Sequence, residues 1–361
     1  MGYIVRKEIL GLSVYKAGKP ISEVKRELGL SDVTKLASNE NALGCSPKVK
    51  AVLKDLIEET HMYPDASNFE LKDALSMKLG VEPDQIFCST GSDSLIRVIC
   101  NTFLGPGDES IMAAITFPRY GDSTKLMGAT CIVIPMENNG LDIEKMVGSI
   151  TEKTKVIWFC NPNNPTGTIF TKTQFVNVLK RIPDNVLIVM DEAYIEYVTS
   201  KEFPDALEFL KDYPNMIILR TFSKAYGLAS LRIGYGIASE ELTSYFNRVI
   251  GPFDVNLFAQ KAAVAALEDQ EFLKLVLETN VAGKDYLCGQ FKLMNLPYIE
   301  TNTNFIMVDT KVDDSEVFNK LLKKGIIVRP GFLLGMPGWL RITIGTGKQN
   351  ELFISALIES L

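Results

Sequence analysis

Five side chains that could act on one ligand each follow an apolar run of this 361-residue chain. Lys224 lies in the segment Thr-Phe-Ser-Lys-Ala-Tyr-Gly, and Arg232 comes eight residues later. Upstream, Asp191 and Tyr194 follow one apolar run, and Asn164 follows another in Asn-Asn-Pro-Thr-Gly. Such runs are typical of buried strands, and ligands of α/β proteins bind where these strands end. An amine, a carboxylate, a phenol, an amide and a guanidinium are therefore predicted to meet around one ligand.

Pyridoxal 5'-phosphate (PLP) is a ligand that can use all five groups. The amine of Lys224 can form a Schiff base with its aldehyde, and the carboxylate of Asp191 can keep its pyridine nitrogen protonated. Tyr194 and Asn164 would hydrogen-bond the phenolic oxygen of the ring. Each residue also has an ordinary interpretation: a solvated lysine, an aspartate that caps a helix, an asparagine that only makes a turn. We prefer PLP because the elements occur together and in order.

The phosphate group of PLP needs a cradle of hydrogen-bond donors, and the segment Ser-Thr-Gly-Ser-Asp-Ser joins a predicted strand to a predicted helix. Backbone amides at the start of that helix can hold a dianion, and the side chains of Ser92, Ser223 and Arg232 complete the set. Asp93 is expected to contribute its backbone amide while its carboxylate caps the helix. Phe117, after the next strand, is predicted to stack on the pyridine ring; otherwise it is a core aromatic.

Two arginines near the C-terminus lie on strand-like segments. Arg329 ends a short apolar run, and Arg341 lies in Trp-Leu-Arg-Ile-Thr-Ile-Gly. A guanidinium on a buried strand costs free energy unless an anion meets it, and it binds carboxylate or phosphate in a bidentate manner. We therefore predict that both arginines bind the anionic end of a substrate. The alternative is an internal ion pair with one of the 44 acidic residues.

Composition argues against several other classes of protein. The net charge of −6 and the pI of about 5.2 argue against a nucleic-acid surface. No apolar run approaches the ~18 residues that span a bilayer, and the N-terminus has no apolar core typical of a secretory signal. The six cysteines form no C-x-x-C pair, and a single histidine leaves no histidine-rich metal site. We expect a cytoplasmic protein without a metal, a nucleic-acid partner or a membrane span.

The order of predicted elements indicates an α/β protein with three parts. Residues 1–35 form an arm, 36–250 a large PLP-binding domain and 251–361 a smaller α+β domain. Alternating apolar strands and amphipathic helices predict a mainly parallel seven-stranded sheet, and a helix capped by Ser46 is expected to begin at Pro47. The expected strands are 85–89, 109–113, 130–135, 155–160, 186–190, 216–220 and 233–238, then 304–309, 326–329 and 339–344. Helices are expected at 92–103, 118–127, 172–181, 240–250, 255–268, 270–294, 314–324 and 348–359.

These motifs together resemble the fold-type I PLP-dependent aminotransferases over essentially the full length of the chain. More closely, the chain resembles the histidinol-phosphate aminotransferases. The resemblance is carried by residues 35–41, 63–65, 91–93, 163–167, 191–194, 220–224 and 340–346. The chain departs from the family pattern at Ala42, Ser94, Ser230 and in segment 251–256, and no departure removes a predicted catalytic group.

The resemblance implies a homodimer whose active sites lie at the subunit interface. Tyr63 would reach the cofactor phosphate of the neighbouring subunit, and Tyr15 on the arm would join Arg329 and Arg341 at the anionic end of the substrate. The implied reaction is a transamination in two halves, in which Lys224 moves the proton at the substrate Cα. Its substrates would be an amino donor, histidinol phosphate, and a 2-oxo acid, 2-oxoglutarate. One arginine site could bind phosphate in one half-reaction and carboxylate in the other.

Three other functions stay open at this point. An aromatic amino-acid aminotransferase would need the same cofactor residues. A PLP-dependent decarboxylase of a phosphorylated amino acid, such as threonine phosphate, would differ in which Cα bond stands perpendicular to the ring. A non-catalytic protein could keep the scaffold as an interaction surface, although it would have no need of Lys224, Asp191 and Arg232 together.

Overall fold

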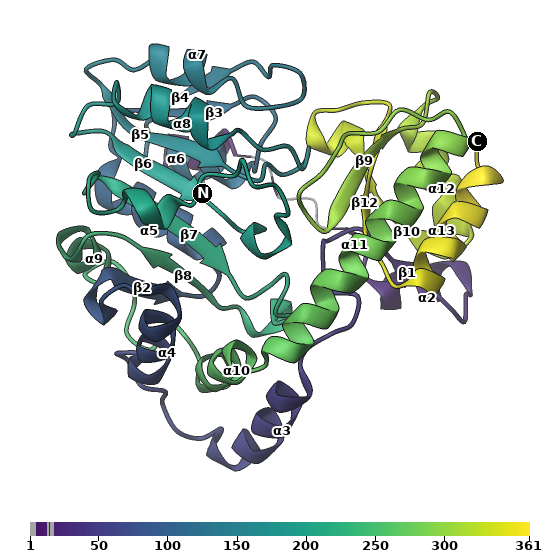
Figure 1. The fold of residues 1–361 in the computed structure, drawn as a ribbon, viewed down its shortest axis with the longest axis horizontal. Coiled ribbons are helices and arrows are strands. Elements are labelled where there is room, and N and C mark those ends of the chain that lie inside the picture. Colours follow the sequence, from purple (N-terminus) through teal and green to yellow (C-terminus); the bar gives the residue numbers. More distant parts are fainter. Residues whose placement is uncertain (1–4, 13, 15–17) are drawn as a thin grey trace.

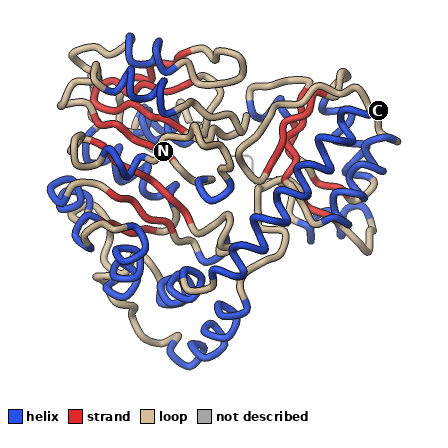
Figure 2. Tube along the Cα trace, in the orientation of Figure 1, coloured by secondary structure: helices blue, strands red, loops and turns tan. Residues whose placement is uncertain are grey.

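The computed structural model describes residues 5–12, 14 and 18–361 and shows two groups of strands, one large and one small. A seven-stranded sheet lies on one side of the molecule, and a three-stranded and a two-stranded sheet lie on the other (Figure 1). The long helix α11 (Gln270–Leu293) runs between the two groups. Helices surround both groups, as the colours of Figure 2 show, so each group of strands has its own layer of helices.

The seven-stranded sheet has the order β2-β8-β7-β6-β5-β3-β4. Strand β8 is antiparallel to both of its neighbours, and the other pairs are parallel. The inner strands are continuous apolar runs buried on both faces, as strands between two helical layers must be. The prediction of an α/β fold with a mainly parallel seven-stranded sheet is confirmed. The strands are β2 (Ile86–Ser89), β3 (Glu109–Ala113), β4 (Thr130–Ile134), β5 (Thr154–Cys160), β6 (Leu187–Asp191), β7 (Met216–Thr221) and β8 (Gly234–Ile237).

Helices cover both faces of this sheet and form two apolar cores. Trp158 and Val189 belong to one core, and their chain neighbours Ile157 and Ile188 belong to the other. This alternation is the two-residue period of a strand, and it ties both helical layers to one sheet. The first core includes α5 (Ser92–Phe103), α6 (Arg119–Leu126) and α9 (Glu240–Phe246). The second includes α3 (Pro47–Asp55), α4 (Phe69–Leu79), α7 (Ile143–Gly148), α8 (Lys172–Leu179) and α10 (Leu257–Leu267).

The small sheets differ from the prediction at the expected strand 326–329, which is two short strands. β10 pairs in parallel with β1, whereas β11 pairs with β12, which also pairs with β9. The chain changes partner at Val328, which lies between the two short strands. The strands are β1 (Thr34–Lys35), β9 (Phe305–Asp309), β10 (Ile326–Ile327), β11 (Arg329–Pro330) and β12 (Trp339–Thr343). The remaining helices are α1 (Lys7–Leu10), α2 (Ile21–Leu28), α12 (Asp314–Lys323) and α13 (Gly347–Ile358).

Local sequence signals set several helix ends. The hydroxyl of Ser46 accepts a hydrogen bond from the amide of Lys48 (3.0 Å), so Ser46 caps α3 as predicted. Thr171 forms a capping box at α8, and Thr346 forms one at α13. Each cap satisfies amide groups that the first turn of a helix leaves without a partner, and so it fixes where the helix begins.

The division of the chain near residue 251 stays a prediction. Helix α10 packs on α3 and α4, and its residues Ala259, Ala262 and Ala263 belong to a core of the large sheet. At the other end of the chain, Leu36 packs into the core of the small sheets. The connection between the two groups of strands is therefore made by α11 and by the segment around residue 36.

Among the residues that the structure describes, no helix is both long enough and apolar enough to cross a membrane. Even the 24-residue α11 carries charged side chains along its length, among them Lys274 and Asp285.

Candidate active site

A cavity of about 260 Å³ lies where the parallel strands of the large sheet end. Asp191 and Cys160, the last residues of β6 and β5, are register partners and both line it. Segment 37–40 and residues of β11 and β12 line it as well. The cavity brings together most of the predicted site residues: Ser92, Asp93, Phe117, Asn164, Asp191, Tyr194, Ser223, Lys224, Arg232, Arg329 and Arg341.

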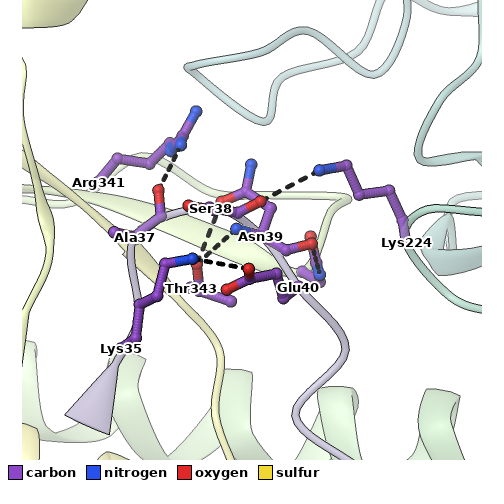
Figure 3. Close-up of polar contacts among 9 residues, drawn as sticks. Lys35, Ala37, Ser38, Asn39, Glu40, Lys224, Arg341 and Thr343 are labelled. Atoms are coloured by element: carbon purple, nitrogen blue, oxygen red, sulfur yellow. Dashed lines mark hydrogen bonds and ion pairs between the residues drawn. The ribbon is translucent and has the colours of Figure 1, made fainter. Parts of the chain in front are cut away.

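Lys224 enters the cavity from the loop after β7. Its Nζ donates a hydrogen bond to the carbonyl oxygen of Ser38 (3.1 Å) (Figure 3), and it lies 5.6 Å from the ring centre of Tyr194. Burial, together with the positive charges of Arg341 and Arg232, lowers the pKa of this amine to about 8. The neutral form of the amine is the nucleophile, and it is therefore accessible near neutral pH.

Asp191 ends β6 and is buried, with 4% of its surface exposed. One carboxylate oxygen accepts a hydrogen bond from the hydroxyl of Tyr120 (2.5 Å), and the other accepts one from the amide of Ala193 (3.2 Å). Burial raises the pKa of Asp191 to about 6, and these two hydrogen bonds oppose the rise. The carboxylate is therefore ionised at neutral pH, as it must be to hold a protonated ring nitrogen.

Tyr120 and Asn39 belong to the site although no motif predicts their roles. Tyr120 is fully buried, stacks on Trp158 (ring centres 4.8 Å apart) and meets Phe117 edge-on (5.8 Å). Asn39 donates from Nδ2 to the hydroxyl of Tyr194 (2.9 Å). The sequence signal that could have revealed Tyr120 is its position three residues after Phe117, in the same short motif at the start of α6.

Asn164 and Tyr194 keep hydrogen-bond donors for a ring oxygen. The Oδ1 atom of Asn164 accepts a hydrogen bond from Arg341 (2.6 Å), so the amide nitrogen is the donor that Asn164 can offer to a ligand. Burial raises the pKa of Tyr194 to about 12, so its hydroxyl keeps its proton at neutral pH. Both residues can therefore donate to a phenolate oxygen.

An anion cradle lies at the N-terminus of α5, formed by backbone 91–92 and the side chains of Ser92, Ser223 and Arg232. Gly91 has φ +89°, and a Cβ atom there would lie 2.7 Å from Nη2 of Arg232. A Cβ atom at Gly234 would lie 2.4 Å from the amide nitrogen of Ser92. Glycine at both positions lets the guanidinium and the neighbouring strand approach the first amides of a 12-residue helix. This arrangement of donors suits a phosphate dianion.

The carboxylate of Asp93 does not cap α5, so that part of the prediction is wrong. The N-cap of α5 is Gly91, which makes no side-chain capping bond. Asp93 instead forms ion pairs with Arg97 (2.6 Å) and Arg119 (2.6 Å). Burial would raise the pKa of Asp93, but the hydrogen bonds from these two arginines outweigh it and the pKa is lowered. Because two guanidinium groups offset its charge, this carboxylate can lie beside an anion cradle.

Arg329 and Arg341 are direct register partners on β11 and β12, and each is 7% exposed. Arg341 donates hydrogen bonds to Asn164 and to the carbonyl oxygen of Ala37 (2.8 Å), and its guanidinium carbon lies 5.2 Å from the ring centre of Phe305. Like charges directly opposite each other destabilise a sheet. Two guanidinium groups that lie side by side on a cavity wall can bind one phosphate or carboxylate, which makes the pair a candidate site for an anionic group.

The segment 34–41, which we call the strap, links two walls of the cavity (Figure 3). The large-sheet wall carries Lys224, and the small-sheet wall carries Arg341. Its first residues pair with β10 in the small sheets. Further along, Arg341 and Lys224 donate hydrogen bonds to consecutive carbonyl groups of the strap, those of Ala37 and Ser38. The strap therefore contacts the predicted nucleophile and the predicted anion-binding arginine at the same time.

Among the described residues, one predicted site residue, Tyr63, is not among those that line the cavity. Tyr63 is 82% exposed and stacks on Phe253, with ring centres 4.7 Å apart. Tyr15 lies outside the residues that the structure describes. The role predicted for Tyr63 therefore requires a second copy of the chain.

The chain is similar to known proteins over almost its full length. Residues 31–357 match the family described as aminotransferase class I and II. The chain belongs to this family of aminotransferases. A histidinol-phosphate aminotransferase of Caldicellulosiruptor saccharolyticus is 51% identical to this aminotransferase over 99% of both chains. Another, of Brevibacillus brevis, is 48% identical over 98% of this chain and 97% of its own.

Solved structures share the fold of this aminotransferase. The histidinol-phosphate aminotransferase of Sinorhizobium meliloti, in complex with PLP, superposes with a TM-score of 0.90 at 27% identity, covering 99% of this chain and 97% of that one. An aspartate aminotransferase of Thermus thermophilus with maleate superposes with a TM-score of 0.84 at 20% identity, covering 100% of both chains. The second likeness concerns the fold alone. The fold is that of the fold-type I PLP-dependent enzymes, as predicted.

The cofactor of this aminotransferase is PLP, and the residues of the cavity fit it. An amine, an ionised carboxylate and an anion cradle line one cavity, and they match the aldehyde, the ring nitrogen and the phosphate of PLP. When bound, PLP supplies an aldehyde that an amine can hold and a ring that withdraws electrons from the substrate Cα. As an aminotransferase, the chain acts on a small-molecule amino donor and a 2-oxo acid.

Proposed function

We propose that this aminotransferase transfers the amino group of histidinol phosphate to 2-oxoglutarate. The observation that carries the proposal is the pair Arg329 and Arg341, buried side by side on the wall that faces Lys224. Two adjacent guanidinium groups can bind a phosphate ester in one half-reaction and a carboxylate in the other. Relatives that are 48–51% identical over nearly the whole chain carry the name histidinol-phosphate aminotransferase, which supports this choice.

The predicted site residues have distinct tasks in this proposal. Lys224 holds the cofactor between turnovers and moves the proton at the substrate Cα, since its amine reaches a neutral form near pH 8. Asp191 keeps the ring nitrogen protonated, and Phe117 stacks on the ring. Asn164 and Tyr194 donate to the ring oxygen. The phosphate is bound by Ser92, the amide of Asp93, Ser223 and Arg232, and the substrate anion by Arg329 and Arg341, with Tyr15 from the arm.

A half-reaction screen of the holoenzyme tests the substrate. Histidinol phosphate, histidinol, phenylalanine and phosphothreonine are each added alone, and the visible absorbance of the cofactor and the release of carbon dioxide are followed. We expect histidinol phosphate to react fastest and histidinol to react at least about 100-fold less efficiently, because histidinol lacks the phosphate group that the two guanidinium groups would bind. Faster reaction with phenylalanine, or carbon dioxide from phosphothreonine, would contradict the proposal and favour one of the alternatives.

We also propose that two copies form a homodimer and complete each other's sites. Tyr63 and Phe253 form an exposed stacked pair, and Met62 and Phe69 in the same segment are 50% and 69% exposed. Large apolar side chains gathered on a surface mark an interaction site. A second copy that covers this patch would remove Tyr63 from water and bring it to the partner's cavity, where its hydroxyl would donate to the cofactor phosphate.

Mixed dimers test this role of Tyr63. The variants Lys224→Ala and Tyr63→Ala are purified separately, mixed in equal amounts, and allowed to exchange subunits. If Tyr63 acts across the interface, half of the dimers are mixed and each contains one intact site, so about a quarter of the wild-type activity returns. If Tyr63 acts within its own chain, every site lacks one residue and mixing restores nothing.

We propose a cytoplasmic location as well. The six cysteines are all free in the structure, and the cytoplasm is a compartment that keeps thiols reduced.

A further inference from the structure

Residues 251–256 form the second part of the connection between α9 and α10. This loop contacts the residues that directly precede the anion cradle in the chain. Asp254 accepts two hydrogen bonds with the same carboxylate oxygen, one from the hydroxyl of Ser89 (2.5 Å) and one from the amide of Thr90 (3.1 Å). Ser89 is the fully buried last residue of β2, and Thr90 directly precedes the cradle backbone at 91–92. Asp254 therefore fixes the turn that connects β2 to α5.

The same loop also holds the other half of the cradle. Asn256 donates from Nδ2 to the carbonyl oxygen of Leu231 (3.1 Å), the residue just before Arg232. Its Oδ1 atom accepts from the amide of Ala259 (2.9 Å) and thereby caps α10. Arg232 has φ +58°, a left-handed conformation that is uncommon for a residue with a side chain. A contact that fixes the preceding residue helps to keep the guanidinium in place over the helix.

Neither Asp254 nor Asn256 is among the described residues that line the cavity, so neither touches a ligand there. The loop that carries them also adopts an unfavourable shape, because Phe253 has φ +59°. Such a shape persists when the surrounding structure holds it. The contacts at Asp254 and Asn256 hold the loop against residues 89–90 and against Leu231, which directly precede the two sides of the cradle.

We propose that the loop 251–256 positions the phosphate-binding groups of PLP, with Asp254 fixing the amides of α5 and Asn256 fixing Arg232. Both are positioning residues, which act through the backbone that they hold. A single loop thus sets the distance between the helix amides and the guanidinium, and a phosphate that must accept from both depends on that distance. The inference rests on the cofactor and not on the choice of substrate.

Binding of PLP and of pyridoxal, which lacks the phosphate, to the apoenzyme separates positioning from general damage. Asp254→Ala removes the acceptor for two donors, and we expect PLP to bind about tenfold more weakly, with pyridoxal unchanged. Inorganic phosphate should compete with PLP less well in the variant, by a similar factor. Asp254→Asn keeps an oxygen that accepts both hydrogen bonds and should restore most of the PLP affinity. Equal weakening of PLP and pyridoxal, or no weakening of PLP, would overturn the proposal.

A second variant keeps the test decisive if Asp254→Ala does not fold. Asn256→Ser retains a side chain that caps α10 but loses the donor to Leu231. We expect a smaller loss, about threefold, for PLP and none for pyridoxal. Asp212→Ala, at an exposed position outside the cavity, is the matched control and should change neither affinity. If Asn256→Ser binds PLP as the wild type does, its part in the proposal fails. These measurements use no amino donor, so their outcome is independent of the proposed substrate.

Discussion

The two walls of the cavity are built in different ways. On the large-sheet wall, Asp191 ends β6 and Lys224 follows β7, and these two strands are neighbours in one parallel sheet. On the small-sheet wall, Arg329 and Arg341 come from antiparallel strands of another sheet and meet only through their register. The first wall carries the groups that we propose act on the cofactor, and the second carries the groups that we propose bind a substrate anion. In this proposal, cofactor chemistry and substrate recognition lie on separate structural supports.

The strap is the element that both walls share. It receives a hydrogen bond from Lys224 on one side and from Arg341 on the other (Figure 3). Changes on one wall should leave the function of the other largely intact, except where they act through this segment or through the hydrogen bond from Arg341 to Asn164.

Replacing Lys224 should have the largest effect, because it removes the amine that we propose both anchors the cofactor covalently and moves the Cα proton. Among the described residues that line the cavity, Lys224 is the only lysine. We expect kcat to fall by about 10⁴-fold or more in Lys224→Ala, as when a catalytic nucleophile is removed elsewhere. Turnover is measured with saturating substrates. Lys224→Ala with kcat within tenfold of the wild type would remove this residue from the mechanism.

Replacing Arg341 should damage only the small-sheet wall. In Arg341→Gln the substrate anion loses a charged, bidentate partner, which costs about 3 kcal/mol, or roughly 100-fold in kcat/KM. PLP affinity, measured on the same preparation, should change little. Arg341→Lys keeps the charge without the bidentate geometry, so its kcat/KM should lie between those of the wild type and of Arg341→Gln. If Arg341→Gln weakens PLP binding as strongly as it weakens substrate binding, cofactor binding and substrate binding are not separated between the two walls.

Replacing Tyr120 should weaken the large-sheet wall by a smaller amount. Its hydrogen bond to Asp191 favours the ionised carboxylate, so in Tyr120→Phe the pKa of Asp191 should rise above the value of about 6 that burial produces. In the proposed mechanism Asp191 acts as an anion, so activity is expected to fall as pH falls through the pKa of Asp191. The acid limb of the pH profile should therefore move to higher pH, with about tenfold lower activity near pH 6. Tyr245→Phe, at a surface position, is the control, and an acid limb unchanged in Tyr120→Phe would contradict this role.

The smallest expected effect is on the pH at which the apoenzyme attaches PLP. This pH depends on residues of both walls, because it follows the pKa of Lys224. Burial and the charges of Arg341 and Arg232 lower the pKa of Lys224 to about 8 from its ordinary value of 10.5. Only the neutral amine attacks the aldehyde, so the rate at which apoenzyme captures PLP should rise with pH and reach half of its maximum near pH 8. Arg341→Gln removes a nearby positive charge and should move this midpoint upward. A wild-type midpoint near pH 10 would mean that the cavity does not perturb the lysine.

The large-sheet wall could be predicted from the sequence because its information is local. Asp191, Asn164 and Lys224 each follow an apolar run within a short motif, and the ends of parallel strands meet at one edge of a sheet. The strands of the seven-stranded sheet were predicted to within a residue or two for the same reason. Short-range patterns therefore sufficed for the fold and for most of the cofactor-binding groups.

The remaining features depend on contacts between distant residues. The pairing of Arg329 with Arg341 requires the register of β11 on β12, and no motif encodes it. The hydrogen bond from Tyr120 to Asp191 joins residues 71 positions apart, through the packing of α6 on the sheet. Asp93 was expected to cap its helix because aspartate often does, but Arg119, 26 positions away, provides a partner of opposite charge. Tertiary packing decided each of these cases.

The proposed function depends on a covalent bond between PLP and the amine of Lys224, and chemical trapping of that bond tests it. Holoenzyme saturated with PLP is reduced with sodium borohydride, digested, and mapped by mass spectrometry, with Lys224→Ala treated in parallel. We expect a pyridoxyl group on the peptide that contains Lys224 in the wild type and none at that position in the variant. A saturated wild-type sample that carries the group on another lysine, or carries none, would contradict it.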